Sequence, residues 1–283
     1  SPAMAQETPP AGSEPGALAG PVAPGWPAPR VRGTRRHALL APAFGALLLL
    51  GWWLLAESGR YAPFIVPTPA SVAERWWRLV EDGSLLRHMG VTLREVFSGL
   101  VIGVAAAFSL GYLIAKNRIA AYTLTPYLIA LQAVPIVAIA PLLIIWFGAG
   151  ITSKVIICAL LVFFPMLVNT ILGVRNIPPD LRDMMRSLEA TPLQTFWHLE
   201  MPAALPIMIG GLKVSATLSV IGAVVGEFVS ASAGLGYLIN FGRGTYDTPL
   251  VIAAVFTLTA LALLLYGTAA WLEAVLLDWR DAS

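Results

Sequence analysis

Residues 155–174 read VIICALLVFFPMLVNTILGV, twenty residues without a charged side chain. At a rise of about 1.5 Å per residue, a helix of this length crosses the hydrocarbon core of a bilayer, which is about 30 Å thick. Further charge-free stretches cover residues 38–56, 96–115, 119–153, 214–226 and 248–272. The pattern predicts an all-α polytopic membrane protein, because helices satisfy every backbone hydrogen bond inside lipid.

The composition agrees with this class of protein. Of the 283 residues, 57% are hydrophobic and only 12% are charged, whereas soluble domains carry about 25% charged residues. The mean hydropathy is +0.75. A membrane barrel is excluded, because its strands would be stretches of about ten residues with alternating polarity. The net charge of +2, without a basic patch, does not indicate a nucleic-acid partner, and the single cysteine, Cys158, cannot form an internal disulfide.

Six membrane-spanning helices follow if residues 119–153 form one long span that is interrupted at Pro126, Pro135 and Pro141, since each proline removes a helix hydrogen bond. An arginine cluster just before the first stretch predicts a cytoplasmic N-terminus by the positive-inside rule: Arg30, Arg32, Arg35 and Arg36. An even number of spans then returns the C-terminus to the cytoplasm. The alternative for residues 38–56 is a cleaved signal peptide.

The chain divides into three parts. Residues 1–29, rich in proline and alanine, are expected to form a disordered cytoplasmic tail. Residues 30–84 hold the first membrane helix and an extracytoplasmic amphipathic segment. In that segment, residues 71–85 place apolar side chains on one helical face: Val72, Trp76, Leu79 and Val80. Residues 85–283 are expected to form a core of five helices, with the loop 175–206 in the cytoplasm.

The loop 175–206 is polar and contains helix-start signals. Asp180 follows two prolines and is placed to cap a first short helix. The run Thr191-Pro192-Leu193-Gln194 supplies a threonine N-cap, a proline at N1 and a glutamine at N3 of a second helix. Two capped helices form a rigid projection, which suits docking into a groove of another protein because little ordering entropy is lost on binding.

The same loop resembles the signature of the permease subunits of ATP-binding-cassette (ABC) importers, EAA-x3-G-x9-I-x-L-P. Aligned on Met201-Pro202, the signature places Leu199 at the isoleucine position and Glu189 at the glycine position. The EAA positions are occupied by Asp183, Met184 and Met185. The glycine of the family is expected to end the first short helix in a left-handed conformation, which glutamate adopts less readily.

Other stretches support the resemblance, namely VPTP (66–69), PLLIIWFG (141–148) and GAVVGEF (222–228). They are similar to the branch that serves nitrate, sulfonates, taurine and thiamine precursors. Within this branch, QAVPIVAIAP (132–141) resembles the members associated with thiamine-precursor or riboflavin uptake. The substrate that the resemblance implies is a thiamine-precursor pyrimidine or a riboflavin-like vitamin, with a sulfonate, taurine or nitrate as the alternative.

The resemblance implies a type I importer permease in the bacterial inner membrane, paired with a second and identical copy. Two ATPase subunits would bind ATP and Mg, while an extracytoplasmic binding protein delivers the solute. The chain itself has no G-x-x-x-x-G-K-[ST] phosphate loop and is expected to be neither an enzyme nor a holder of a metal or another cofactor. The residues expected to couple it to the ATPase are Asp183, Met184, Met185, Leu188, Glu189, Thr191 and Phe196.

Polar residues inside the spans are candidates for the translocation pathway. Ser215, Ser219 and Glu227 fall on one stripe of a helix, and an ionisable group at membrane depth is costly and by default functional. Gln132 and Asn169 complete the set. The alternatives are close helix packing for the serines and pairing with a cation or the backbone for Glu227.

Two other function classes compete with the importer permease. An integral-membrane enzyme or assembly subunit would be favoured by an intramembrane cluster of histidines or carboxylates, and a secondary transporter by an internal repeat. Neither feature stands out in the sequence.

Overall fold

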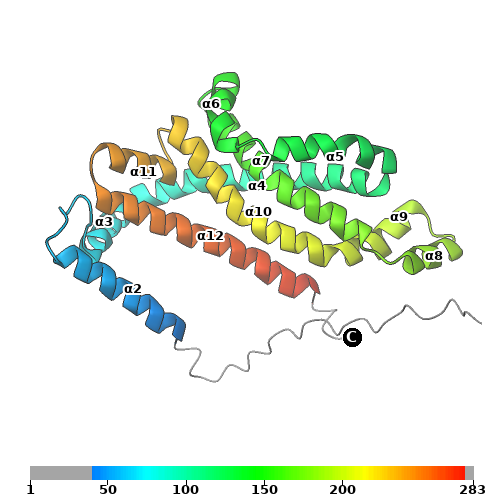
Figure 1. Ribbon diagram of the computed structural model, residues 1–283, viewed down its shortest axis with the longest axis horizontal. Helices are drawn as coiled ribbons and strands as arrows, with labels where there is room; N and C mark the ends of the chain where they lie inside the picture. Colours follow the sequence, from blue (N-terminus) through cyan, green and yellow to red (C-terminus); the bar gives the residue numbers. More distant parts are fainter. Residues whose placement is uncertain (1–39, 278–283) are drawn as a thin grey trace, which may run out of the picture. The chain divides into compact units, whose positions relative to one another are not determined.

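In the computed structural model, residues 40–277 are described (Figure 1). The expected tail 1–29 and the arginine cluster before the first span lie outside this range. The described part of the chain is helical, with these elements: α2 (Leu40–Glu57), α3 (Pro69–Glu81), α4 (Ser84–Lys116), α5 (Arg118–Gln132), α6 (Ile136–Phe147), α7 (Ile151–Arg175), α8 (Pro179–Ser187), α9 (Pro192–Thr195), the π turn η1 (Phe196–Glu200), α10 (Met201–Ser230), α11 (Leu235–Gly244) and α12 (Thr248–Leu277). The chain divides into two compact units, Ser1–Leu50 and Gly51–Ser283. The helix α2 begins in the first unit and ends in the second.

The core of the second unit is built on α7, which packs along both α4 and α10 (Figure 1). Cys158 of α7 lies at the closest approach of the three helices and is fully buried. A Cβ atom added to Gly99 of α4 would lie 2.2 Å from the Cβ of Cys158, and one added to Gly222 of α10 would lie 2.7 Å from its Cα. Glycine is therefore required on both sides of Cys158, because any larger residue would separate the helices.

By length and hydropathy, four helices in the range 40–277 are able to cross a membrane: α4, α7, the continuous helix Pro192–Ser230, and α12. The pair α5 and α6 counts as a fifth span if it is taken as one, although it bends by 95° at its break. The break falls at Pro135, whereas Pro126 and Pro141 lie inside α5 and α6. The expected count of six is not confirmed, and α2, an apolar helix of 18 residues, stays a prediction as the remaining span.

The amphipathic helix expected at 71–85 is present as α3, shifted toward the N-terminus. Thr68 caps it by accepting a hydrogen bond from the Ser71 N–H, and Pro69 occupies the first turn. Val72 and Leu79 are buried, as expected for the apolar face. The helix ends at Glu81 because Gly83, with φ of +71°, turns the chain into α4.

Candidate functional site

The segment between α7 and α10 begins with α8, whose start differs from the expected one. The N-cap is Pro178, which makes no side-chain cap bond, and Asp180 lies inside the first turn. The expected cap by Asp180 is wrong, because Pro179 takes the N1 position and Asp180 therefore lies at N2, two places past the N-cap. In the first turn, Asp180 still interacts favourably with the positive end of the helix dipole.

Glu189 ends α8 in a left-handed conformation. Its φ is +50°, and the N–H of Ala190 donates to the Met185 carbonyl. This is the conformation expected for the glycine of the family signature at this position, and glutamate adopts it here against its preference.

Thr191 forms the predicted capping box. Its hydroxyl accepts from the Gln194 N–H at 3.3 Å, and the Gln194 side chain accepts from the Thr191 N–H at 2.8 Å. The sequence predicted a separate short helix here, but the structure shows a longer one. It continues through η1 into α10 as one helix, Pro192–Ser230. In the π turn just before Pro202, the Met201 N–H donates to the Phe196 carbonyl, so the chain stays helical up to the proline.

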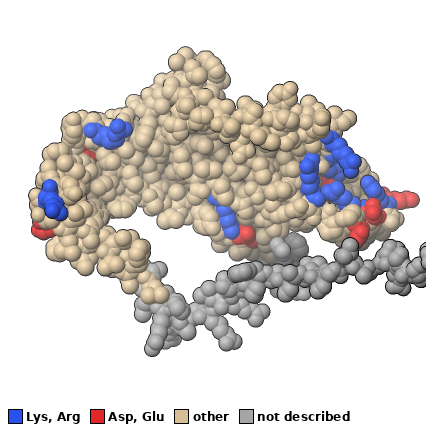
Figure 2. Space-filling view, in the orientation of Figure 1, with Lys and Arg blue, Asp and Glu red and all other residues tan. Residues whose placement is uncertain are grey.

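We call residues 179–196 the coupling segment. Its apolar side chains Met184 and Leu188 are exposed by 49% and 68%. The other expected coupling residues Asp183, Glu189 and Thr191 are also exposed, whereas Met185 and Phe196 are half-buried. Figure 2 shows blue and red side chains gathered at the end of the molecule that holds α8 and α9, with few charges along the middle of this face.

Phe196 is an internal anchor of the coupling segment. Its ring lies 5.3 Å from the Tyr112 ring and 6.5 Å from the Phe108 ring, both on α4 and both in edge-on geometry. Nearby, Glu200 is 2% exposed and accepts hydrogen bonds from the Tyr112 hydroxyl and the Lys116 ammonium. The sequence reasoning missed Glu200, although a carboxylate between Leu199 and Met201-Pro202 was a visible signal.

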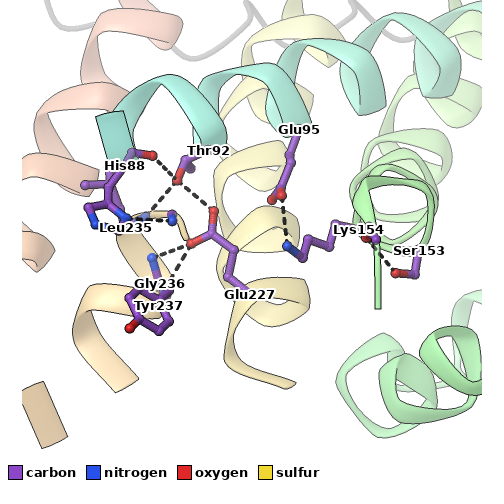
Figure 3. A network of polar contacts seen from close by, with 11 residues as sticks. His88, Thr92, Glu95, Ser153, Lys154, Glu227, Leu235, Gly236 and Tyr237 are labelled. Carbon is purple, nitrogen blue, oxygen red and sulfur yellow. Dashed lines mark hydrogen bonds and ion pairs between the residues drawn. The ribbon is translucent and has the colours of Figure 1, made fainter. Parts of the chain in front are cut away.

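At the other end of α10, Glu227 binds three donors from two other segments. It is 1% exposed, and one carboxylate oxygen accepts from the Thr92 hydroxyl of α4 at 2.7 Å. The other oxygen accepts from the backbone N–H groups of Gly236 and Tyr237, which open α11 (Figure 3). The carboxylate thus takes the position of a helix N-cap, where N–H groups lack partners inside the helix.

Further polar groups around Glu227 were missed in the sequence. Glu95 of α4 and Lys154 of α7 form a buried ion pair with N···O of 3.2 Å (Figure 3). The Gly234 N–H donates to Nδ1 of His88, and the Leu235 N–H donates to the Thr92 hydroxyl. We call these residues, with Glu227, the buried polar network; it joins α4, α7, α10 and the start of α11.

The remaining pathway candidates lie in two places. The hydroxyls of Ser215 and Ser219 are fully buried and donate to the carbonyls of Val162 and Ala216. Asn169 of α7 packs against Gly211 of α10. The Ser215 and Asn169 contacts are those of close helix packing between α7 and α10, whereas the Ser219 hydroxyl bonds within α10. Gln132 is exposed on the last turn of α5 and does not belong to this interface. A pathway role for the set stays a prediction.

The described helices, four or five of which are long and apolar enough to cross a membrane, define a polytopic helical membrane protein. Residues 99–276 match the family described as "Binding-protein-dependent transport system inner membrane component". The chain belongs to this family of ABC transporter permeases. Membership places it in a membrane as a component of an importer and implies ATPase partners.

Individual relatives point to several solutes. The chain is 43% identical over 255 residues to the riboflavin transport system permease protein RibX of Chloroflexus aurantiacus, covering 89% of this chain and 95% of the relative. It is 33% identical over 246 residues to the formylaminopyrimidine transport permease protein ThiX of Halalkalibacterium halodurans, covering 87% and 98%. Other relatives are named for aliphatic sulfonates and taurine.

A solved structure supports the fold. The MetNI methionine ABC transporter in an inward-facing conformation matches with a TM-score of 0.60 at 19% identity, over 68% of this chain and 95% of that chain. The expected family and the expected class of helical permease fold are therefore confirmed.

Proposed function

We propose that this chain, paired with a second copy, forms the translocation pathway of an importer for riboflavin or a related vitamin. The observation that carries the proposal is the similarity to the riboflavin permease along nearly the whole chain. The formylaminopyrimidine relative supports the same class of nitrogen heterocycle. The alternative substrates are a sulfonate, taurine or nitrate. The relatives named for sulfonates and taurine support the first two.

The coupling segment supplies the docking site for an ATPase in this proposal. The Thr191 capping box holds the start of its second helix, so that less conformational entropy is lost when the segment enters a groove. The exposed Met184 and Leu188 offer apolar surface, and the flexible thioether of methionine adapts to an irregular pocket. Each of the two copies would engage one ATPase subunit, which binds ATP and Mg, and both termini would lie in the cytoplasm of a bacterial cell.

Uptake by the reconstituted complex tests the substrate. Proteoliposomes containing the permease and its ATPase subunits, with the cognate binding protein added outside, are supplied with ATP inside and with labelled riboflavin, formylaminopyrimidine, taurine or nitrate. We expect riboflavin to accumulate and unlabelled formylaminopyrimidine to compete more strongly than taurine or nitrate. Accumulation of taurine or nitrate without riboflavin uptake would assign the chain to the other branch.

A further inference from the structure

We infer that Glu200 is a positioning residue for ATP-driven transport: it fixes the coupling segment to the end of α4, so that segment and helix move as one body. The inference rests on the proposed docking of the coupling segment. It starts from a carboxylate that is 2% exposed although it lies within five residues of the exposed α9. A buried carboxylate is costly unless charged or hydrogen-bonded partners surround it.

Both oxygens of Glu200 are engaged by α4. Oε1 accepts from the Lys116 ammonium and Oε2 accepts from the Tyr112 hydroxyl, each at 2.6 Å. Tyr112 and Lys116 are four residues apart and therefore share one face of α4. The Lys116 side chain is 46% exposed whereas the Glu200 side chain is 2% exposed, so loss of the lysine would leave the buried carboxylate without its charged partner, which is costly.

Phe196 and Glu200 are the two ends of the π turn. The turn Phe196–Glu200 contains one residue more than an α-helical turn would, because its closing bond runs from the Met201 N–H to the Phe196 carbonyl. Both ends of the turn face α4: Phe196 through the aromatic contacts and Glu200 through the two hydrogen bonds. Two anchors within one turn define the orientation of the segment, not only its distance.

Two arginines add backbone ties in the same place. The Arg175 guanidinium donates to the Ile114 carbonyl at the end of α4, and the Arg182 guanidinium donates from α8 to the Val174 carbonyl at the end of α7. The Arg182 contact therefore ties the coupling segment to the end of α7, and the Arg175 contact ties the same end of α7 to α4. Glu200 is the buried charge in this set of contacts.

The far end of α4 enters the buried polar network. α4 has 33 residues and is about 50 Å long at 1.5 Å per residue. His88 and Thr92, in the second and third turns of α4, bind the backbone that leads into α11. Glu200 would pass a displacement of the coupling segment to α4. Because α4 itself contacts the backbone that leads into α11, no other helix is needed to transmit the displacement.

The test replaces the electrostatic tie by a covalent one. In the double variant Lys116→Cys/Glu200→Cys, both charges are removed together, which is better tolerated than removing one. The variant is measured before and after treatment with a short bifunctional thiol reagent. Cys158, the chain's own thiol, is fully buried and does not compete for the reagent. The exposed ion pair of Glu74 and Arg78 on α3 gives the matched control, Glu74→Cys/Arg78→Cys.

The first readout is the yield of the cross-link in the complete complex, without nucleotide and with ATP plus vanadate. If segment and helix move as one body, the yield is the same in both states. A yield that falls by fivefold or more with ATP and vanadate would show that the two separate, and would overturn the inference. This readout does not depend on the identity of the solute.

The second readout is the stimulation of ATP hydrolysis by the binding protein loaded with riboflavin. Allosteric coupling between two sites typically changes affinity by about 5- to 150-fold. We take the lower end of this range and expect the untreated double variant to lose at least about fivefold of the stimulation of ATP hydrolysis. The cross-linked variant should regain it. The control pair should behave as the parent in both forms. Parent-like stimulation in the untreated variant, or a cross-link that blocks it, would overturn the inference.

A milder variant and a docking measurement complete the experiment. Tyr112→Phe removes one hydrogen bond and is expected to lower the stimulation less than the double variant does. A cysteine placed at the exposed Leu193 should be protected from maleimide when the ATPase subunits bind. Absence of protection in the parent background would refute the docking proposal itself. In a Lys116→Ala/Glu200→Ala background, which adds no further thiol, retained protection shows that Glu200 acts after docking, whereas lost protection would overturn the positioning role.

Discussion

Replacing Glu227 by alanine should destabilise the fold far more than replacing it by glutamine. Alanine leaves the backbone N–H groups of Gly236 and Tyr237 without their acceptor. The Thr92 hydroxyl loses one acceptor too, but it also lies 3.3 Å from the His88 carbonyl and can donate there. Two orphaned donors remain.

Each buried donor without an acceptor costs about 1–3 kcal/mol, which gives about 2–6 kcal/mol for the alanine variant. Glutamine keeps one oxygen, which can face the two N–H groups of α11, while its amide donates to Thr92. Every donor then has an acceptor. The loss is limited to the difference between hydrogen bonds to a charged carboxylate and hydrogen bonds to a neutral amide, about 1–2 kcal/mol. The expected order of stability is parent, then glutamine, then alanine.

The buried thiol of Cys158 provides the assay. It is the only cysteine of the chain and is fully buried, so a thiol-reactive dye added to the purified protein in detergent micelles reports thermal unfolding. Glu74→Ala, which removes an exposed carboxylate, is the control and should leave the transition within the scatter of the parent. If the Glu227→Ala and Glu227→Gln variants lost the same stability, the hydrogen-bond geometry would not be what holds α11, and the reasoning would be refuted.

Four further predictions concern solute uptake, membrane topology, the coupling segment and helix packing. Glu227→Gln should assemble yet take up less solute than the parent if the residue faces the pathway; parent-like uptake across solute concentrations would leave it a structural role alone. Cysteines at Ser71 and Thr195 should be labelled by an impermeant reagent from opposite sides of the membrane, and labelling from one side would contradict the six-helix topology. Met184→Asp should weaken binding of the ATPase subunits in a pull-down, because it places a charge in a largely dry interface, and unchanged binding would move the docking site elsewhere. Gly99→Ala should destabilise by about 1–3 kcal/mol through overpacking against Cys158, whereas Gly90→Ala, with open space around it, should stabilise by up to about 1 kcal/mol; equal effects on the unfolding transition would contradict the packing.

Local patterns in the sequence were sufficient for the helices and for several of their ends. The length of the charge-free stretches predicted the four helices that are able to cross a membrane, because hydrocarbon thickness and helix rise are constants, whereas the expected count of six spans is not confirmed. The capping box of Thr191 was predicted correctly, since both of its partners lie within three residues of each other. The spacing of the family signature placed Glu189 at the position of a left-handed glycine, but the conformation that glutamate takes there was left open and came from the structure. The cap assigned to Asp180 failed for an equally local reason, the preference of Pro179 for N1.

The buried charges depend on the tertiary structure alone. Lys116 and Glu200 are 84 residues apart, and Thr92 and Glu227 are 135 apart. A carboxylate at the edge of an apolar stretch has the same local sequence whether it faces headgroups, a pathway or another helix. Its partner is decided by the rotation of each helix about its axis, and that rotation is set by side chains packed against neighbouring helices. The sequence therefore determined which segments are helical and apolar, whereas helix packing decided that Glu200 and Glu227 bind opposite ends of α4.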